Sequence, residues 1–304
     1  MKPNALQRFL VIVLLLFLIR LILPSMVVPV GIASALSIVL TIVFVAVPIL
    51  ALYAAAAHVW SAKLSATFLA SGVALHAVSY FLMRSSGKEG FLPALFDASA
   101  QTGLLIWCVG LGSLITAVVK DKNLIPPMAV FLAGFDMYII FKPTTLPRQI
   151  IENAPEVFHA VAAKVPTVLP SGTGGMAVGP GTYIGPADFI FLAMFFVALF
   201  KFQMRTRETL LWIMPVLVLY LALVLFGSGL SIGPISLAAL PALLPIGLTV
   251  LLVNWKQFAM NQEEKLGMAL ATILAVSLAA FGIYSAAKAK KNPVAPPVAS
   301  PASE

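Results

Sequence analysis

The feature that most restricts what this chain can fold into is a succession of apolar runs, each long enough to cross a lipid bilayer. The first extends from Arg8 to Trp60 and contains one other charged side chain, Arg20. A spanning helix needs about 20 apolar residues, so this run alone holds two. Of the 304 residues, 61% are hydrophobic and 10% are charged. Such a composition excludes an ordinary soluble domain and predicts an integral membrane protein that crosses the bilayer many times.

Charged residues and prolines divide the chain into about nine predicted spans. We therefore expect an all-α fold, a polytopic bundle of transmembrane helices. The predicted spans are two within 8–60, parted near 24–29, and then 64–83, 102–119, 126–141, 183–202, 210–226, 237–253 and 266–286. They form an N-terminal group over 1–125, a second half over 126–253 and an extra helix over 254–286. The tail, 287–304, is rich in Pro, Ala and Ser, and we expect it to be disordered.

The longest predicted connection, 142–182, lies within the second half of the chain. It is polar and rich in Pro and Gly. A connection of this length is usually functional or disordered. Within it, the sequence predicts a helix at the membrane interface over 146–163 and a flexible linker over 170–181.

Two acidic residues, Asp136 and Asp188, are predicted to lie inside spans, and we call them the aspartate pair. A charged side chain at the centre of a spanning helix costs roughly 2.5 to 3.5 kcal/mol, so its presence indicates a function. The other nine acidic residues are predicted to lie in or beside polar connections: Glu89, Asp97, Asp121, Glu152, Glu156, Glu208, Glu263, Glu264 and Glu304. The aspartate pair is therefore the first candidate for chemistry.

The chemistry of two facing carboxyl groups is well defined. In a medium of low dielectric constant they cannot both ionise, so they share one proton. This is the working state of an aspartic protease, in which the ionised carboxylate takes a proton from an attacking water. The protonated carboxyl donates to the carbonyl oxygen and then to the leaving amine. The reaction needs no metal and no cofactor.

Two other interpretations fit the same aspartates. Each can bond to a neighbouring helix or to a water molecule and serve packing alone. Paired acids that line a wet cavity also form proton or cation relays, so a proton-coupled transporter or channel is the alternative function. The pairing alone does not separate a protease from a transporter, and the surrounding residues have to do so.

The charges, the cysteine and the histidines limit partners and cofactors. The net charge is +8 at pH 7, but Lys and Arg gather at the ends of apolar runs, where they anchor helices in the bilayer. The expected partner is therefore lipid, and no nucleic acid is expected. The single cysteine, Cys108, lies in an apolar run and is predicted to pack there. His58, His76 and His159 are scattered, so no zinc site is predicted.

Three short segments occur in order along the second half. Residues 134–154 contain Gly-Phe-Asp, Lys-Pro, Leu-Pro-Arg and Glu-Asn-Ala; residues 184–191 read Ile-Gly-Pro-Ala-Asp-Phe-Ile-Phe; residues 241–244 read Pro-Ala-Leu-Leu. In this order they resemble the Tyr-Asp, Gly-x-Gly-Asp and Pro-Ala-Leu motifs of presenilins and signal peptide peptidases, which are intramembrane aspartyl proteases. The resemblance covers roughly 134–253 and implies a presenilin-like catalytic half.

The resemblance implies a function and a set of site residues. The family hydrolyses peptide bonds in or near the membrane-spanning segments of other proteins. Carried over, Asp136 and Asp188 are catalytic, while Pro241, Ala242 and Leu243 shape the substrate site. The long loop is expected to gate the site or to pair with substrate in extended form. The implied partners are transmembrane proteins or peptides, and the sequence leaves open whether oligomeric copies or accessory subunits take part. The expected location is the plasma membrane of a prokaryotic cell.

Two positions depart from the family pattern. Phe135 stands where the family usually has Tyr, which removes a hydroxyl group near the aspartate pair. After Gly185 and Pro186, Ala187 stands where a second Gly is expected, and it adds a methyl group where close backbone approach is expected. Both carboxyl groups are kept, so the sequence predicts an active protease.

Overall fold

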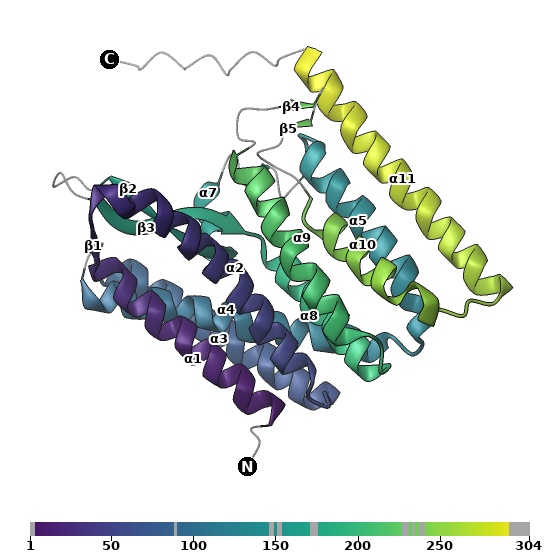
Figure 1. Ribbon diagram of the computed structural model, residues 1–304, viewed down its shortest axis with the longest axis horizontal. Helices are drawn as coiled ribbons and strands as arrows, with labels where there is room; N and C mark the ends of the chain where they lie inside the picture. Colours follow the sequence, from purple (N-terminus) through teal and green to yellow (C-terminus); the bar gives the residue numbers. More distant parts are fainter. Residues whose placement is uncertain are drawn as a thin grey trace, which may run out of the picture.

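The computed structural model describes residues 4–87, 90–145, 149–150, 154–170, 176–226, 231–232, 235–236 and 241–291. Within these parts the chain forms ten α-helices and two small antiparallel sheets. The long helices lie side by side in one bundle, with the N-terminal helices at one side and the C-terminal helix at the other (Figure 1). The disordered tail predicted over 287–304 begins too early, because the C-terminal helix continues to Lys291, while 292–304 lie outside the described residues.

The N-terminal group contains four long helices. They are α1 (Ala5–Ile22), α2 (Ala33–Ala56), α3 (Ala62–Ser85) and α4 (Phe91–Val118). α3 packs along α4, and α1 packs against both α2 and α4. At Gly103 and Gly110 the α4 backbone comes so close to α3 that an added Cβ would collide with the α3 backbone. Small residues at such contacts are typical of helix pairs in membranes.

The rest of the chain adds five helices of at least 12 residues, one of which packs against three of the others. They are α5 (Ile125–Phe141), α8 (Pro186–Lys201), α9 (Thr206–Phe226), α10 (Leu243–Asn254) and α11 (Gln262–Lys291). α10 packs against α5, α8 and α9, while α11 lies along α5. α8 also packs against α2 and α4, which joins the second half to the N-terminal group.

A β-hairpin precedes α8 and is joined by residues from the N-terminal group. It consists of β2 (Ala163–Pro170) and β3 (Met176–Ile184), which follow the short helix α7 (Pro155–Val161). On the other edge of β3, the two residues of β1 (Val27–Val28) pair with Met176 and Ala177, so the strand order is β1-β3-β2. A second, two-stranded sheet, β4 (Ser231–Ile232) with β5 (Ile235–Ser236), lies between α9 and α10.

The hairpin corrects two predictions about the long loop. The linker predicted over 170–181 is wrong, because Pro170 ends β2 and 176–181 belong to β3, while 171–175 lie outside the described residues. The interfacial helix predicted over 146–163 is also too long, because α7 ends at Val161 and the chain then becomes extended. The prolines fit into this sheet because Pro166 faces Pro180 at a β-bulge, where a missing backbone donor is tolerated.

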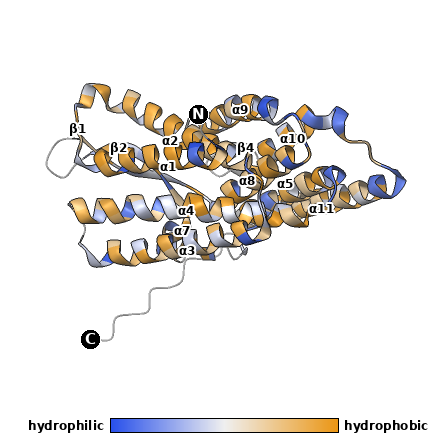
Figure 2. Cartoon of the chain, turned by 90° about the horizontal axis from the view of Figure 1, so that it is seen from below, coloured by the Kyte–Doolittle hydropathy of each residue, from blue (hydrophilic) through white to orange (hydrophobic). Residues whose placement is uncertain are grey.

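Seven of the described helices are long and apolar enough to cross a membrane: α1, α2, α3, α4, α5, α9 and α11. Figure 2 shows hydrophobic residues along most of the length of the long helices. This agrees with a polytopic, helical membrane bundle. α8 and α10, with 16 and 12 residues, are shorter. The count of nine spans therefore stays a prediction.

One prediction about acidic residues is wrong. α4 begins at Phe91, well before the predicted start at residue 102, so Asp97 lies inside a helix that is long and apolar enough to span the membrane. Asp136 and Asp188 are therefore not the only acidic residues within long apolar helices. Asp97 forms an ion pair with Lys164 of β2, and this pair explains how the helix accommodates the charge of Asp97.

Candidate functional site

Asp136 lies near the C-terminal end of α5, and close contacts on two sides fix this helix. A Cβ added to Gly134 would lie 2.5 Å from Ala275 Cα of α11, and a Cβ added to Gly247 of α10 would lie 3.0 Å from the Ala129 carbonyl oxygen of α5. Neither contact leaves room for a larger residue at the glycine position. α5 is therefore held firmly between α10 and α11, which restricts the positions open to Asp136.

The Pro-Ala-Leu segment contacts Asp136 directly. The backbone N–H of Leu243 donates a hydrogen bond of 2.9 Å to Asp136 Oδ2. Leu243 is the first residue of α10, and the first N–H groups of a helix have no acceptor within the helix. Asp136 supplies that acceptor, and the positive end of the helix dipole favours its negative charge. Pro241 and Leu243 are buried and Ala242 is partly buried, so this segment forms a packed wall beside the carboxylate.

Asp188 lies in the first turn of α8. Its backbone N–H donates to the Gly185 carbonyl oxygen at 3.2 Å, and Pro186 occupies the first position of the helix, where its fixed φ is favourable. A Cβ added to Gly185 would lie 3.8 Å from Asp188 Oδ2, which places the carboxylate near that glycine. The buried Cys108 of α4 directs its Sγ to the Pro186 carbonyl oxygen at 3.7 Å. The start of α8 is thus seated on α4.

The two carboxyl groups of the aspartate pair interact electrostatically with each other, and both side chains are partly buried. They come from separate helices, α5 and α8, and α10 packs against both of these helices. The N-terminus of α8 carries one carboxyl group and the N-terminus of α10 binds the other.

The two departures from the family pattern both lie at exposed positions. Phe135 is 39% exposed, and its ring stacks between the rings of Phe131 and Tyr138, with centroid separations of 5.8 and 6.4 Å. Ala187 is also exposed, so its methyl group does not occupy the close backbone contact that was expected there. Neither substitution introduces a packing conflict at the aspartate pair.

Sequence reasoning missed a polar network that attaches the β-hairpin to the N-terminal helices. The side chain of Lys164, on β2, pairs with Asp97 of α4. The Lys164 N–H donates to Gln101 Oε1 at 3.0 Å, and its carbonyl oxygen accepts from Arg20 of α1 at 2.8 Å. We call these four residues the hairpin anchor. The spacing of Asp97 and Gln101, four residues apart on one helix face, was a signal that could have indicated it.

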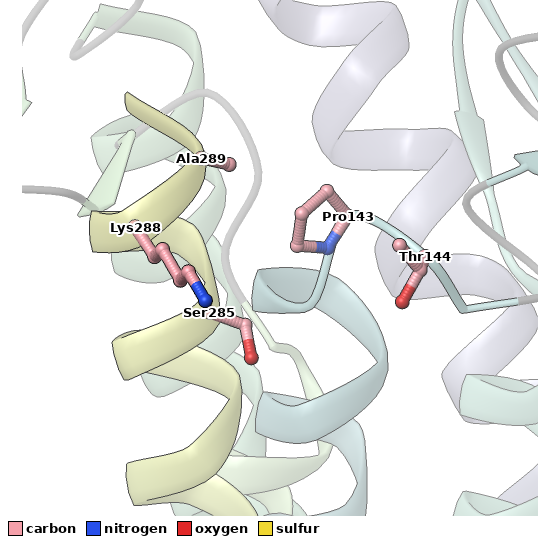
Figure 3. Close-up of a pocket in the computed structure, with 5 residues that line it drawn as sticks. All are labelled: Pro143, Thr144, Ser285, Lys288 and Ala289. Atoms are coloured by element: carbon pink, nitrogen blue, oxygen red, sulfur yellow. The ribbon is translucent and has the colours of Figure 1, made fainter. Parts of the chain in front are cut away.

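A surface opening lies at the end of α5, and it is distinct from the aspartate pair. Its lining comes from the chain just after α5 and from α11: Pro143, Thr144, Ser285, Lys288 and Ala289 (Figure 3). Neither aspartate lines this opening. Among the residues that the structure describes, no group of three or more His, Cys, Asp or Glu side chains is arranged to hold a metal ion.

Comparison with models of protein families, with curated protein sequences and with solved structures finds no match to this chain. The functional argument therefore depends on the residues and their geometry.

Proposed function

We propose that this protein is an intramembrane aspartyl protease of the presenilin and signal peptide peptidase type, which hydrolyses peptide bonds in the membrane-spanning segments of other proteins. One observation carries the proposal. Two aspartates from different helices interact electrostatically, and one of them accepts the N–H of Leu243 in the Pro-Ala-Leu segment. This hydrogen bond joins two of the three short motifs, which are far apart in the sequence, and the third motif carries Asp188.

The proposed reaction uses the aspartate pair with one shared proton. The ionised carboxylate takes a proton from water as the water oxygen bonds to the carbonyl carbon of the substrate. The other carboxyl donates its proton to the carbonyl oxygen, which gives a tetrahedral intermediate with two hydroxyl groups. The carboxyl that took the water proton then donates it to the amide nitrogen, while the other carboxylate takes a proton from a hydroxyl group, and the C–N bond breaks. The Leu243 N–H fixes the orientation of Asp136 during these steps. The chain's own side chains supply every proton transfer.

A transmembrane substrate must first be unwound, because a helix keeps its carbonyl groups in its own hydrogen bonds. β3 offers such a substrate an edge. β1 occupies one side of β3 at Met176 and Ala177 only, and within the described residues no strand pairs with 178–184 on that side. This edge leads through Gly185 to Asp188. We propose that an extended substrate segment pairs with 178–184, which brings the following bond to the aspartate pair.

Pairing with β3 predicts a pattern with a period of two along the substrate. In an antiparallel or parallel pair, only alternate N–H groups of a strand point toward its neighbour. We therefore expect N-methylation of single substrate residues to lower kcat/KM by about 5- to 10-fold at alternate positions, from the loss of a hydrogen bond of about 1 kcal/mol. Methylation at the intervening positions serves as the control. A methylation scan without alternation would contradict the pairing.

The proposed function is tested with purified protein in liposomes and a single-span peptide substrate. We expect the substrate to be cut into two fragments, and a hydroxyl-containing inhibitor that mimics the transition state of aspartyl proteases to block the cleavage and to label the protein on photo-cross-linking. Flux of protons or cations that depends on pH, without any proteolysis, would replace this proposal with the transporter interpretation.

A further inference from the structure

The hydroxyl group of Tyr220, on α9, is buried and has no hydrogen-bond partner, and it is the only side-chain polar atom of this kind among the described residues. A buried donor without an acceptor costs about 1–3 kcal/mol. Such groups are rare in native structures, and each requires an explanation. A site that awaits a ligand is one such explanation.

The surroundings of Tyr220 indicate which site this is. The phenol group interacts electrostatically with both Asp136 and Asp188. α9 packs against α10, the helix whose first N–H binds Asp136. At the far end of this contact, the buried Asn254 of α10 donates to Thr209 Oγ1 of α9 at 2.9 Å, which fixes the two helices relative to each other. Tyr220 therefore lies on a helix that packs against the helix bound to Asp136.

We propose that the Tyr220 hydroxyl donates a hydrogen bond to the carbonyl oxygen of the scissile peptide bond, and this proposal rests on the protease function proposed above. In the first step the water oxygen bonds to the carbonyl carbon, and its proton goes to the ionised aspartate. The π electrons of the carbonyl group move to its oxygen, which takes the proton of the other aspartate. Tyr220 keeps its own proton throughout, and its hydrogen bond strengthens as electron density moves to that oxygen.

This role accounts for the missing partner of Tyr220, because the acceptor arrives with the substrate. Phe135 is next to Asp136 in the sequence, but it cannot take this role because its side chain carries no hydroxyl group. A structural role for the Tyr220 hydroxyl has the opposite signature. A hydroxyl that stabilised the bundle would be hydrogen-bonded in the unliganded protein, and its removal would lower stability.

The test is Tyr220→Phe, which removes one oxygen atom and keeps the ring. We expect kcat to fall by about 10²-fold, the effect of losing one donor to a developing oxyanion, and KM to change less than about 2-fold. The affinity for the transition-state-mimicking inhibitor should fall by the same factor as kcat. The midpoint of unfolding in denaturing detergent should stay unchanged or rise, because the variant no longer buries an unpaired hydroxyl group.

The matched control is Tyr284→Phe, since Tyr284 is 65% exposed on α11 and the same atom is removed there. Its kcat should equal that of the wild type. If Asp136→Asn abolishes cleavage while Tyr220→Phe keeps wild-type kcat, the role of Tyr220 is overturned and the protease function stands. A fall in kcat together with a lower unfolding midpoint would also overturn the role. If the wild-type protein cuts no substrate, the protease function fails, and the role of Tyr220 fails with it.

Discussion

Replacing either member of the aspartate pair by Asn should lower the cleavage rate of a transmembrane peptide by about 10²- to 10⁴-fold, which is the usual contribution of a positioned general acid or base. An Asn side chain has no carboxyl group and cannot share a proton, so both steps of the reaction lose a participant. The double variant Asp136→Asn/Asp188→Asn should be no slower than the single variants, because residues that act as a unit are not additive.

These substitutions should leave the fold intact. In Asp136→Asn the amide oxygen of the new side chain can still accept the N–H of Leu243, so the contact between α5 and α10 is kept. The expression level and the unfolding midpoint in detergent test whether the variants keep the fold. Asp121→Asn is the matched control. In the link before α5, Asp121 Oδ1 accepts a hydrogen bond of 2.8 Å from the backbone N–H of Asn123, and an Asn side chain caps equally well. Cleavage at the wild-type rate by either single variant of the aspartate pair would remove the basis for the protease proposal.

The second large effect is expected in stability, at the hairpin anchor. Lys164→Met keeps an apolar side chain of similar length but removes the ion pair with the Asp97 carboxylate. The two side chains retain 18% and 29% of their exposure, so the cost should be below the roughly 3–5 kcal/mol of a fully buried pair, at about 2 kcal/mol. Cleavage should fall as well, because β2 and β3 lead directly into α8 and Asp188.

A second variant separates loss of the ion pair from loss of packing. Asp97→Asn removes the same ion pair and keeps the side-chain volume, and we expect it to cost at least as much as Lys164→Met, because Arg20 also loses the neighbouring negative charge of Asp97. The control is Arg84→Met in the exposed pair of Arg84 with Glu156, which should cost less than about 1 kcal/mol. The measurement is the free energy of unfolding in mixed micelles. Equal losses for Lys164→Met and Arg84→Met would show that Asp97 does not depend on Lys164.

The parts of the fold that depend on apolar length were predictable from the sequence. The predicted span over 64–83 corresponds to α3, and the span over 126–141 corresponds to α5, because about 20 apolar residues suffice to specify such a helix. The start of α4 was predicted too late, since Asp97 and Gln101 look like loop residues until their partner on β2 is known. Composition also concealed the β-hairpin, because Pro and Gly indicate a loop unless the facing strand is identified.

The candidate site was predictable only where a motif marks it. Asp136, Asp188 and the Pro-Ala-Leu segment were selected by their rarity in apolar runs and by a family resemblance, and the structure brings Leu243 to Asp136. Tyr220 has no such mark, because a tyrosine in an apolar helix is ordinary. The role proposed for Tyr220 depends on the packing of α9 against α10 and on a hydroxyl group without a hydrogen-bond partner. Both are properties of the three-dimensional arrangement.

The close contact between α5 and α11 offers a way to detect movements of the helix that carries Asp136. Gly134 and Gly282 bring the two backbones close together, so we expect α5 and α11 to move together. Leu270, on the outer side of α11, is 60% exposed and remote in sequence from every residue assigned to the site. A fluorescent label at Leu270 would therefore convert a reorientation of the helix that bears Asp136 into an optical signal.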